Sequence, residues 1–458
     1  MKIKIYKGAV LITLLLSLGG CKKYLDAKSD KSLVIISTTQ DLQSLMDDNQ
    51  SINWNNPSSD EASSDEYYLD NSAYLALPEV QKRNLYTWQR ADLFRPYTNL
   101  PNDWNLVYNN VYVANTVLDN MIKVERNKGN AANWDNIKGQ ALFLRAHSFY
   151  KAATIWSLAY DQGSSTSDLG IPLRLNSNFN EPSIRSSVEQ TYSQIIKDLK
   201  AAVPLLNTTP VHVLRSSKQA AYGLLARTYL AMRRYDAALL YADSCLQLKN
   251  TLLDYNALDT TSAYPINQFN TEVIYDATVG GYDSGIIGDT QAKIDSVLYA
   301  GYSLNDLRRS IFFTNNGDGS HYFKGSYEGT FSQFNGLATD EVYLIRAECN
   351  ARLGDVDKAM SDLNTLLEKR YKSGTFVPLS ASNANVALGK ILLERHKELV
   401  MRGSRWMDIK RFNKEGAGLT LSRVLNGKVF TLPANDLRFA LPLPNDVIAL
   451  SGMPQNPR

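Results

Sequence analysis

The sequence has little of what most metal, redox and hydrolytic sites are built from. Only three of its 458 residues are cysteine and only four are histidine. The histidines are scattered along the chain, at His147, His212, His321 and His396. Since protein zinc sites gather Cys and His ligands, no His-rich metal site is predicted. The sequence also lacks a G-x-S-x-G elbow, a Walker loop and a dinucleotide fingerprint, so we expect no cofactor and no catalytic residue of those classes.

Neither sign of charge dominates. The chain has 49 basic and 46 acidic residues, and three of the lysines lie within the first 20 residues. Without that leading segment the two signs balance, which gives no support for nucleic-acid binding. The two later cysteines, Cys245 and Cys349, each lie on a predicted helix face. We therefore expect two buried thiols rather than a disulfide.

The leading segment resembles the signal peptide of bacterial lipoproteins. Lysines precede an apolar run from Ala9 to Leu18, which is too short to span a bilayer. The run ends in Leu-Gly-Gly-Cys, which looks like a lipobox with cleavage before Cys21. An ordinary secretory signal beside a chance cysteine is the alternative, but the small residues before Cys21 favour the lipobox. We predict a signal peptide over residues 1–20 and an anchor of several acyl chains, including palmitate, on Cys21.

The clearest structural pattern runs from Thr339 to Tyr371 and predicts two helices joined by a tight turn. Thr339 is expected to cap the first helix, and Gly354 stands where a left-handed C-cap is wanted. Apolar residues at helical spacing form one stripe on each helix: Val342, Ile345, Ala347, Cys349 and Leu353, then Ala359, Leu363 and Leu366. This is the spacing of a tetratricopeptide helix pair.

The same pattern occurs earlier, between Tyr222 and Ala242. One common offset relates Tyr222, Ala226 and Ala238 to Tyr343, Ala347 and Ala359. An ordinary amphipathic hairpin would explain either copy alone, but two copies in register favour a repeat. Since such a pair cannot cover its own apolar face, it needs stacked neighbours. We therefore predict a mainly α chain with at least three stacked helical pairs.

Apolar stripes and capping residues predict further helices in the rest of the chain, such as the stripe through Val111, Tyr112, Leu118 and Ile122 and the capping box of Ser187 with Gln190. Their expected ranges are 39–48, 102–122, 137–159, 187–206, 216–232, 235–249, 383–402 and 404–412. The proline-punctuated tail, residues 441–457, is expected to be extended.

Two stretches break the helical pattern. Residues 51–74 are polar, acidic and aromatic without any period, and residues 254–333 carry nine glycines and short β-like runs such as Val273–Tyr275. A long irregular stretch between helices is usually functional. We expect the irregular segments 51–88 and 254–333 to lie side by side.

Five acids in the first stretch could hold a hard cation such as calcium through oxygen ligands. They are Asp60, Glu61, Asp65, Glu66 and Asp70. Because their spacing fits no known calcium loop, we favour a solvated acidic loop and predict no metal.

Several separated motifs follow one another along the chain in a characteristic order. The lipobox is followed by KYLD at 23–26, then by KGQALFLRA at 138–146, IIKDL at 195–199 and the two repeat pairs. ERHKEL at 394–399 and GSRWMD at 403–408, with Arg411, match the signature E-R-x-x-E-L … G-x-R-W-x-D-[LI]-x-R. Leu443-Pro444 and the final Gln-Asn-Pro at 455–457 fit the closing motif. In this order the motifs resemble those of the SusD/RagB family of outer-membrane nutrient-binding lipoproteins. The resemblance covers nearly all of the chain after residue 20.

This resemblance implies a scaffold of tetratricopeptide-like pairs, an α-α superhelix, with irregular segments forming the ligand face. It divides the chain into an N-terminal SusD-like region (21–250), a loop-rich insertion (251–335) and a C-terminal SusD/RagB region (336–458). Family members are not enzymes. They capture glycans or, in the RagB-like branch, peptides, and close over a SusC-like TonB-dependent transporter.

We therefore expect a lipid-anchored protein of the outer membrane that captures glycans, with peptide capture as the alternative. A glycoside hydrolase needs only two carboxylates and is the remote alternative. The family implies an outward-facing anchor. Lys22 and Lys23 depart from the acidic export signals common among surface lipoproteins, which leaves the leaflet open.

The C-terminal signature is expected to fix the fold rather than to catalyse. Arg405 and Asp408 are i, i+3 neighbours that can pair, and Glu398 lies one turn before Gly403. His396 is expected to be a satisfied helix residue.

Aromatic side chains on the two irregular segments are the candidate ligand platform. Sugar rings present flat C–H faces that stack on aromatic rings, beside hydroxyls that bond to polar groups. For any single tyrosine a packing role is the favoured interpretation, but at least two of the group should be exposed on one face beside polar partners. The candidates are Trp54, Tyr67, Tyr68, Tyr74, Trp88, Tyr282, Tyr302, Tyr322 and Tyr327.

Overall fold

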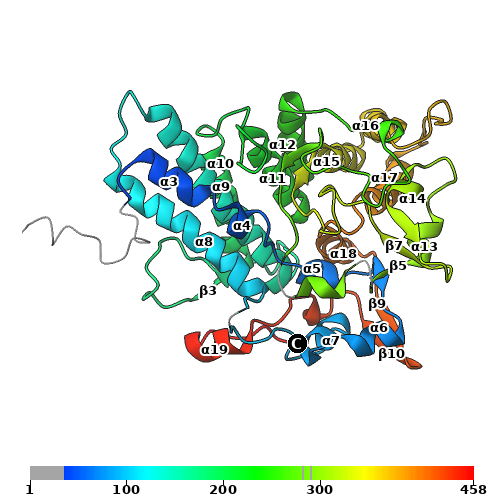
Figure 1. The fold of residues 1–458 in the computed structure, drawn as a ribbon, viewed down its shortest axis with the longest axis horizontal. Coiled ribbons are helices and arrows are strands. Elements are labelled where there is room, and N and C mark those ends of the chain that lie inside the picture. Colours follow the sequence, from blue (N-terminus) through cyan, green and yellow to red (C-terminus); the bar gives the residue numbers. More distant parts are fainter. Residues whose placement is uncertain (1–35, 99, 281–282, 289–290) are drawn as a thin grey trace, which may run out of the picture.

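The structure, a computed structural model, describes residues 36–458 apart from 99, 281–282 and 289–290. The predicted signal peptide, Cys21 and Tyr282 lie outside these residues. Helices dominate the described chain (Figure 1). The α-helices are α3 (Thr39–Met46), α4 (Asn49–Ile52), α5 (Ser59–Ala62), α6 (Asn71–Ala76), α7 (Val80–Tyr86), α8 (Asp103–Asn120), α9 (Ala131–Trp156), α10 (Val188–Ala202), α11 (Lys218–Ala231), α12 (Tyr235–Leu248), α13 (Ser296–Ala300), α14 (Arg308–Ile311), α15 (Thr339–Arg352), α16 (Val356–Glu368), α17 (Ala384–Glu398), α18 (Arg405–Lys414) and α19 (Asn445–Ser451).

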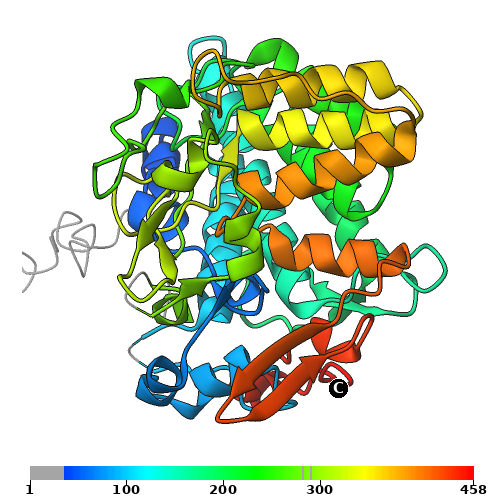
Figure 2. The same cartoon turned by 90° about the vertical axis from the view of Figure 1, so that its right-hand side faces the viewer.

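The long helices stack in chain order, which confirms the predicted mainly α fold. Helix α8 packs on α9, α9 on α10, α10 on α11 and α11 on α12. The stack continues from α12 to α15 and α16, and α17 covers both of the latter (Figure 2). The two predicted repeat pairs, α11–α12 and α15–α16, are therefore adjacent in space, joined through α12 and α15. The irregular segment 254–333 separates them in sequence only.

The repeat positions behave as their sequence spacing predicts. Ala226, Ala238, Ala347 and Ala359 are all fully buried where the helices approach closely. Gly354 has φ +90°, the left-handed conformation that a glycine adopts most readily. These small residues and this turn are what allow each pair to close.

The α15 cap differs from the prediction. The N-cap is Ala338, and no side chain caps the helix, so Thr339 does not play that role. Asp340 and Glu341 are instead buried and form ion pairs with Arg402 and Arg227. The acidic first turn thus binds α11 and the turn between α17 and α18, as well as its own helix dipole.

Three residues assigned to apolar stripes face solvent instead. Tyr112 and Ile122 lie on the open side of α8 and the turn after it, and Leu353 is exposed at the end of α15. The tail is not wholly extended, because α19 forms within it and ends at the left-handed Gly452. The capping box at Ser187 and Gln190 is present as predicted.

Short strands connect parts of the chain that are distant in sequence. They are β1 (Tyr67–Tyr68), β2 (Leu169–Pro172), β3 (Arg185–Ser187), β4 (Val273–Tyr275), β5 (Lys293–Ile294), β6 (Phe313–Asn315), β7 (His321–Phe323), β8 (Leu337–Ala338), β9 (Leu421–Leu425) and β10 (Lys428–Leu432). All pair antiparallel, as β1–β5, β2–β3, β4–β8, β6–β7 and β9–β10.

The two irregular segments lie side by side, as predicted. Tyr67 and Tyr68 pair with Ile294 and Lys293 across β1 and β5. Further along, Asn56 forms a bridge with Val279, and the Gly280 N–H donates to the carbonyl of Asn56 over 2.9 Å. A side chain on Gly280 would collide with Asn55, so the close approach requires glycine there. Backbone pairing therefore joins the first irregular segment to the second.

Candidate functional site

Four of the nine candidate aromatics are buried and cannot stack on a ligand. Tyr67, Trp88, Tyr302 and Tyr327 are each at most 1% exposed. Each polar end is already bound inside the protein, which explains the burial of these amphipathic rings. These four predictions were wrong.

Two of the buried rings surround one arginine. The guanidinium of Arg423, from β9, lies 5.2 Å from the Tyr67 ring centroid and 4.9 Å from that of Trp88. The Tyr67 hydroxyl donates to the carbonyl of Ala62 over 2.6 Å, and Trp88 Nε1 donates to the carbonyl of Ser63 over 3.0 Å. These aromatics fasten the first irregular segment to the C-terminal hairpin.

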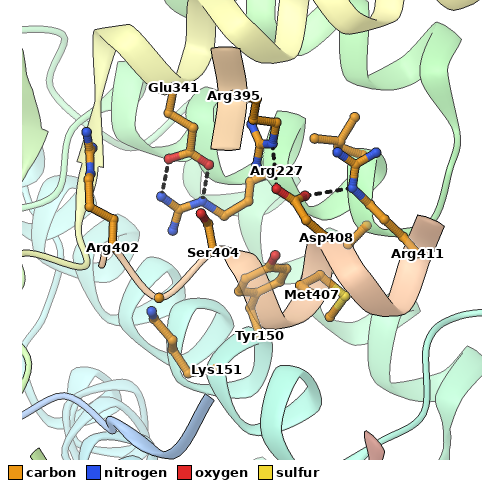
Figure 3. Close-up of a pocket in the computed structure, with 13 residues that line it drawn as sticks. Tyr150, Lys151, Arg227, Glu341, Arg395, Arg402, Ser404, Met407, Asp408 and Arg411 are labelled. Carbon is orange, nitrogen blue, oxygen red and sulfur yellow. Dashed lines mark hydrogen bonds and ion pairs between the residues drawn. The ribbon is translucent and has the colours of Figure 1, made fainter. Parts of the chain in front are cut away.

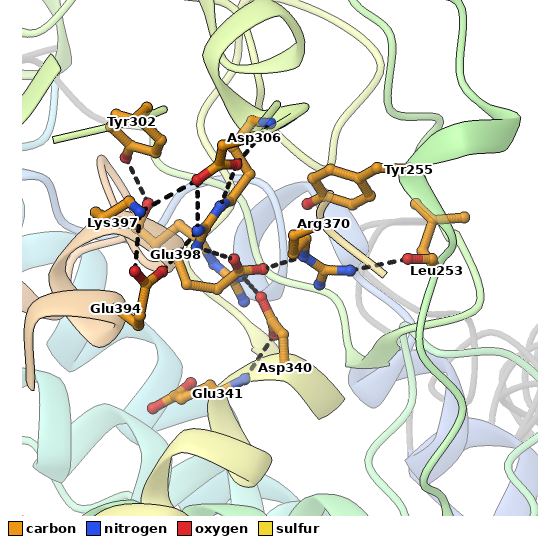
Figure 4. Close-up of polar contacts among 12 residues, drawn as sticks. Leu253, Tyr255, Tyr302, Asp306, Asp340, Glu341, Arg370, Glu394, Lys397 and Glu398 are labelled. Atoms are coloured by element: carbon orange, nitrogen blue, oxygen red, sulfur yellow. Dashed lines mark hydrogen bonds and ion pairs between the residues drawn. The ribbon is translucent and has the colours of Figure 1, made fainter. Parts of the chain in front are cut away.

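The other two buried rings, Tyr302 and Tyr327, belong to an ionic network between the second irregular segment and the helices. Figure 4 shows the part of this network around Tyr302 and Glu398. The Tyr302 hydroxyl donates to the carbonyl of Lys397 over 2.7 Å, and that of Tyr327 bonds to Glu272. At the centre, Glu398 accepts from Arg370 over 2.6 Å and from Arg308 over 2.9 Å. Since both arginines and Glu398 are fully buried, this network holds the segment against α16 and α17.

The remaining described candidates keep accessible surface. Trp54 is 39% and Tyr68 37% exposed, and Tyr74 and Tyr322 are half-buried. Tyr68 lies opposite Lys293 in the β1–β5 ladder, and the Lys293 ammonium is 3.0 Å from Asp70 and 2.8 Å from Asp318. We call Tyr68, Tyr74, Tyr322, Lys293, Asp70 and Asp318 the strand-junction patch.

Contacts within the strand-junction patch hold its rings in place. The ring centroids of Tyr74 and Tyr86 are 6.0 Å apart. The Tyr86 hydroxyl also accepts a hydrogen bond from the backbone N–H of Leu69, the residue after Tyr68, over 2.7 Å. Strand β7, which carries Tyr322, packs beside β5. Trp54 is placed separately, beside Gly280.

Sequence reasoning missed an aromatic stack next to this patch. His321, the neighbour of Tyr322, stacks on Tyr299 with ring centroids 3.6 Å apart. The Arg309 guanidinium lies 4.7 Å from the same tyrosine ring. Histidine and arginine carry no aromatic-platform signal in a sequence, so only their position on β7 and α14 identifies them.

The acidic loop is not solvated, contrary to the prediction. Asp60, Glu61 and Glu66 are buried, and Glu61 and Glu66 accept the backbone N–H groups of Gly403 and Met401. These bonds are 2.8 Å and 2.6 Å long. The carboxylates of Glu61 and Glu66 therefore bind backbone N–H groups beside the C-terminal signature rather than a cation.

Within that loop, two carboxyl groups share one environment. Burial raises the pKa of both Glu61 and Glu66, and the nearby charge of Glu61 raises that of Glu66 further. His396, on α17 as predicted, has Nε2 3.6 Å from Glu66 Oε1 without forming a hydrogen bond. Burial lowers the pKa of His396 to about 4, so the imidazole is neutral and unsatisfied, not satisfied as expected.

The C-terminal signature forms the predicted polar network with different partners. Arg405 binds Asp65 of the acidic loop over 2.7 Å and 2.8 Å and does not pair with Asp408. Asp408 instead joins Arg395 and Arg411, each over 2.8 Å (Figure 3). Arg395, Asp408 and Arg411 line a narrow pocket of about 20 Å³, room for about one water molecule. A substrate does not fit there, so the network is structural.

The structure also contains a groove that sequence reasoning did not find. It measures about 610 Å³ and lies between α8, the loop after β2 and α19. Its aromatic lining is Trp104, Tyr108, Tyr112 and Phe179. One polar side chain in its wall is engaged within the protein, since Asn115 donates to the carbonyls of Arg174 and Asn176. We call it the α8–α19 groove.

Within the residues that the structure describes, three further findings bear on function. No group of three or more His, Cys, Asp and Glu side chains is arranged to hold a metal ion. No helix is both long enough and apolar enough to cross a membrane. Cys245 and Cys349 are free and buried, as predicted.

Comparison with known proteins extends over most of the chain. A family model described as "Starch-binding associating with outer membrane" matches residues 23–230, and one described as "SusD family" matches residues 339–437. Together the two ranges span about two thirds of the chain. None of the curated proteins compared with the chain matches it.

Solved structures share the fold at low sequence identity. A SusD superfamily protein from Bacteroides thetaiotaomicron is 20% identical with a TM-score of 0.72, over 92% of this chain and 100% of that one. A SusD-like carbohydrate binding protein from Bacteroides vulgatus is 19% identical with a TM-score of 0.64, over 91% and 97%. The likeness confirms the fold, and with the two matched family models it leads to one conclusion. The chain belongs to the SusD family.

Proposed function

We propose that the protein captures glycans without catalysing their breakdown, and that the strand-junction patch forms part of the binding surface. The observation that carries this proposal is the exposed Tyr68 ring directly opposite the Lys293 ammonium. The ring offers a stacking face, while Lys293, Asp70 and Asp318 offer hydrogen bonds to sugar hydroxyls. The carbohydrate binding named for the Bacteroides vulgatus relative supports this assignment.

The second part of the proposal is the route of the ligand. We propose that a lipid anchor on Cys21 holds the protein at the outer membrane, facing outward, where it passes the glycan to a SusC-like TonB-dependent transporter. The support is the lipobox in the sequence together with the outer-membrane association in the description of the matched family. Cys21→Ala should release the protein from the membrane fraction, and affinity purification from solubilised outer membranes should recover a TonB-dependent barrel.

Calorimetry of the Cys21→Ala protein against a glycan panel and a peptide mixture tests the ligand class. Heat with one or more glycans and none with peptides is expected. Peptide binding without glycan binding would replace glycan capture with the peptide-binding alternative. A reducing-sugar assay on the bound glycans should show no release over hours, and steady release would identify a hydrolase.

A further inference from the structure

Two buried carboxylates lie without a positive partner where four parts of the chain meet. Asp276 follows β4 and is fully buried, and neither of its carboxylate oxygens has a hydrogen-bond partner. Glu328 is also buried, and its Oε1 has no partner. In the described part of the chain, no lysine, arginine or histidine forms an ion pair with either residue. Burial raises the pKa of Asp276 to about 8 and that of Glu328 to about 7, because the charged form of each group is costly to bury without a partner. A cation bound between the two would remove that cost.

The two carboxylates share one neighbour, the half-buried Gln268. Its Nε2 donates to Glu328 Oε2 over 2.7 Å, and the same amide lowers the pKa of the nearby Asp276 carboxyl group. The negative charge of Glu328 raises the pKa of Asp276. The hydroxyl of Thr278 adjoins Glu328, is buried and has no hydrogen-bond partner of its own. These two neighbours of the carboxylates, Gln268 and Thr278, are neutral, and each carries an oxygen atom.

The backbone around Asp276 is fixed, so the cluster is preorganised. The Asp276 N–H donates to the carbonyl of Val213 over 3.0 Å, and its own carbonyl accepts from Asn53 Nδ2 over 2.7 Å. The cluster thus connects the chain before α11, the first irregular segment beside Trp54, and two parts of the second irregular segment, residues 268–278 and Glu328.

We propose that Asp276 and Glu328 are the anchoring ligands of a calcium ion, with the Thr278 hydroxyl and water completing its shell. Two carboxylates balance the charge of one divalent cation. Calcium takes six to eight oxygen ligands in flexible geometry and accepts loop residues, whereas magnesium demands a near-ideal octahedron. Since the site has only two acids, neutral oxygens must supply the remaining ligands.

A cation at this site would have a structural consequence. Gln268, the shared neighbour, is half-buried and directly precedes the exposed Phe269. A bound cation would fix residues 268–278 and 328 against Asn53. It would thereby hold the second irregular segment in register with the first, which is independent of whether the ligand is a glycan.

The test measures thermal unfolding of the full chain in EGTA and in 1 mM CaCl₂. Calcium should raise the midpoint by several degrees, because it binds the folded state preferentially. The double variant Asp276→Asn with Glu328→Gln keeps the shape and removes both charges, so its midpoint should not respond. The matched control, Asp357→Asn with Glu368→Gln, removes two exposed acids of α16 and should keep the full response.

Crystals grown with CaCl₂ provide a readout that does not depend on the variants folding. An anomalous peak between Asp276 and Glu328 is the expected result. The proposal is overturned if calcium leaves the wild-type midpoint unchanged, if the double variant responds as strongly as wild type, or if the peak lies elsewhere. Equal midpoint shifts with MgCl₂ and CaCl₂ would overturn the assignment of calcium.

Discussion

The helical pairs and the irregular segments are held together by different forces. In α15–α16, Ala347, Ala359 and Leu363 pack in an apolar core of residues that are near in sequence. In the irregular segments, buried charges bind groups hundreds of residues away, as Glu61 and Glu66 do with Gly403 and Met401. The first kind of packing tolerates similar apolar residues, whereas the second requires each charge to find its own partner.

This difference locates the fragile part of the molecule. Removing one partner of a buried ion pair leaves the other charge desolvated and uncompensated, which costs more than the pair itself contributed. The irregular segments carry the exposed aromatics yet depend on such pairs. Their stability should therefore respond to single charge changes more than the stability of the helical pairs responds to changes of packing.

Arg370→Met should produce the largest loss. Arg370 follows α16, is fully buried and binds Glu272 over 2.7 Å, Glu398 over 2.6 Å and the carbonyl of Leu253 over 2.8 Å. Removing the guanidinium strands two carboxylates, which should lower the free energy of unfolding by about 3–5 kcal/mol. Urea unfolding followed by circular dichroism measures this change.

The adjacent lysine supplies the control for that prediction. Lys369 pairs with Asp254 over 3.1 Å, and both side chains are about two-fifths exposed. Lys369→Met should therefore cost about 0–1 kcal/mol. Equal losses from the two variants would show that burial of the network does not determine its importance.

Sequence periodicity could predict the helical pairs because their contacts are local. The stripe through Val342, Ile345 and Cys349 is a consequence of helical spacing alone, and the common offset of the repeats confirms it. Thr339 was misassigned as a cap because Asp340 and Glu341 have distant partners, which no local pattern encodes.

Ala359→Leu sharpens the comparison from the scaffold side. Ala359 is fully buried against α15, so the added methylenes must displace neighbouring side chains. We expect a loss of about 1–3 kcal/mol in urea unfolding, smaller than that of Arg370→Met. Ser361→Leu, on the exposed side of the same helix, should change stability by no more than about 0.5 kcal/mol. A larger loss from Ser361→Leu would mean that this surface is covered.

The candidate site was only partly predictable, and the reason is again distance. The composition of residues 51–88 and 254–333 predicted that these two segments lie side by side. The pairing of Tyr68 with Lys293 agrees with this prediction. Which rings are exposed depends on Arg423 and Lys397, which lie far along the chain and bind Tyr67 and Tyr302. A local sequence pattern does not encode such distant contacts.

Glu66→Gln tests the irregular segments through pH. A carboxyl group whose pKa is raised by folding stabilises the protein fully below its unfolded value, near 4.5, and that stability is lost as pH rises through the folded value. Wild-type stability should therefore fall relative to Glu66→Gln between pH 5 and pH 8, by at most about 1.4 kcal/mol per pH unit. Glutamine can still accept the Met401 N–H and donate to Glu61.

Thermal midpoints of both proteins at pH 5, 6, 7 and 8 measure this difference. The exposed Glu368→Gln serves as the control and should track wild type at every pH. A difference between Glu66→Gln and wild type that stays constant over this range would contradict the raised pKa of Glu66.

The smallest effect on stability should come from Tyr68→Ala, which separates the strand-junction patch from the α8–α19 groove as the glycan site. Tyr68 is accessible and opposite Lys293, so its removal should leave the free energy of unfolding within about 0.5 kcal/mol of wild type. Loss of one stacking ring should weaken binding of a glycan selected from the panel by about 0.5–1.5 kcal/mol, a two- to tenfold rise in Kd. Tyr112→Ala removes a comparable ring, 48% exposed, from the groove and should leave Kd unchanged. If calorimetry finds the opposite, with Tyr112→Ala weakening binding and Tyr68→Ala not, the glycan binds on the helical side of the molecule. The irregular segments would then serve to hold the fold together rather than to bind the ligand.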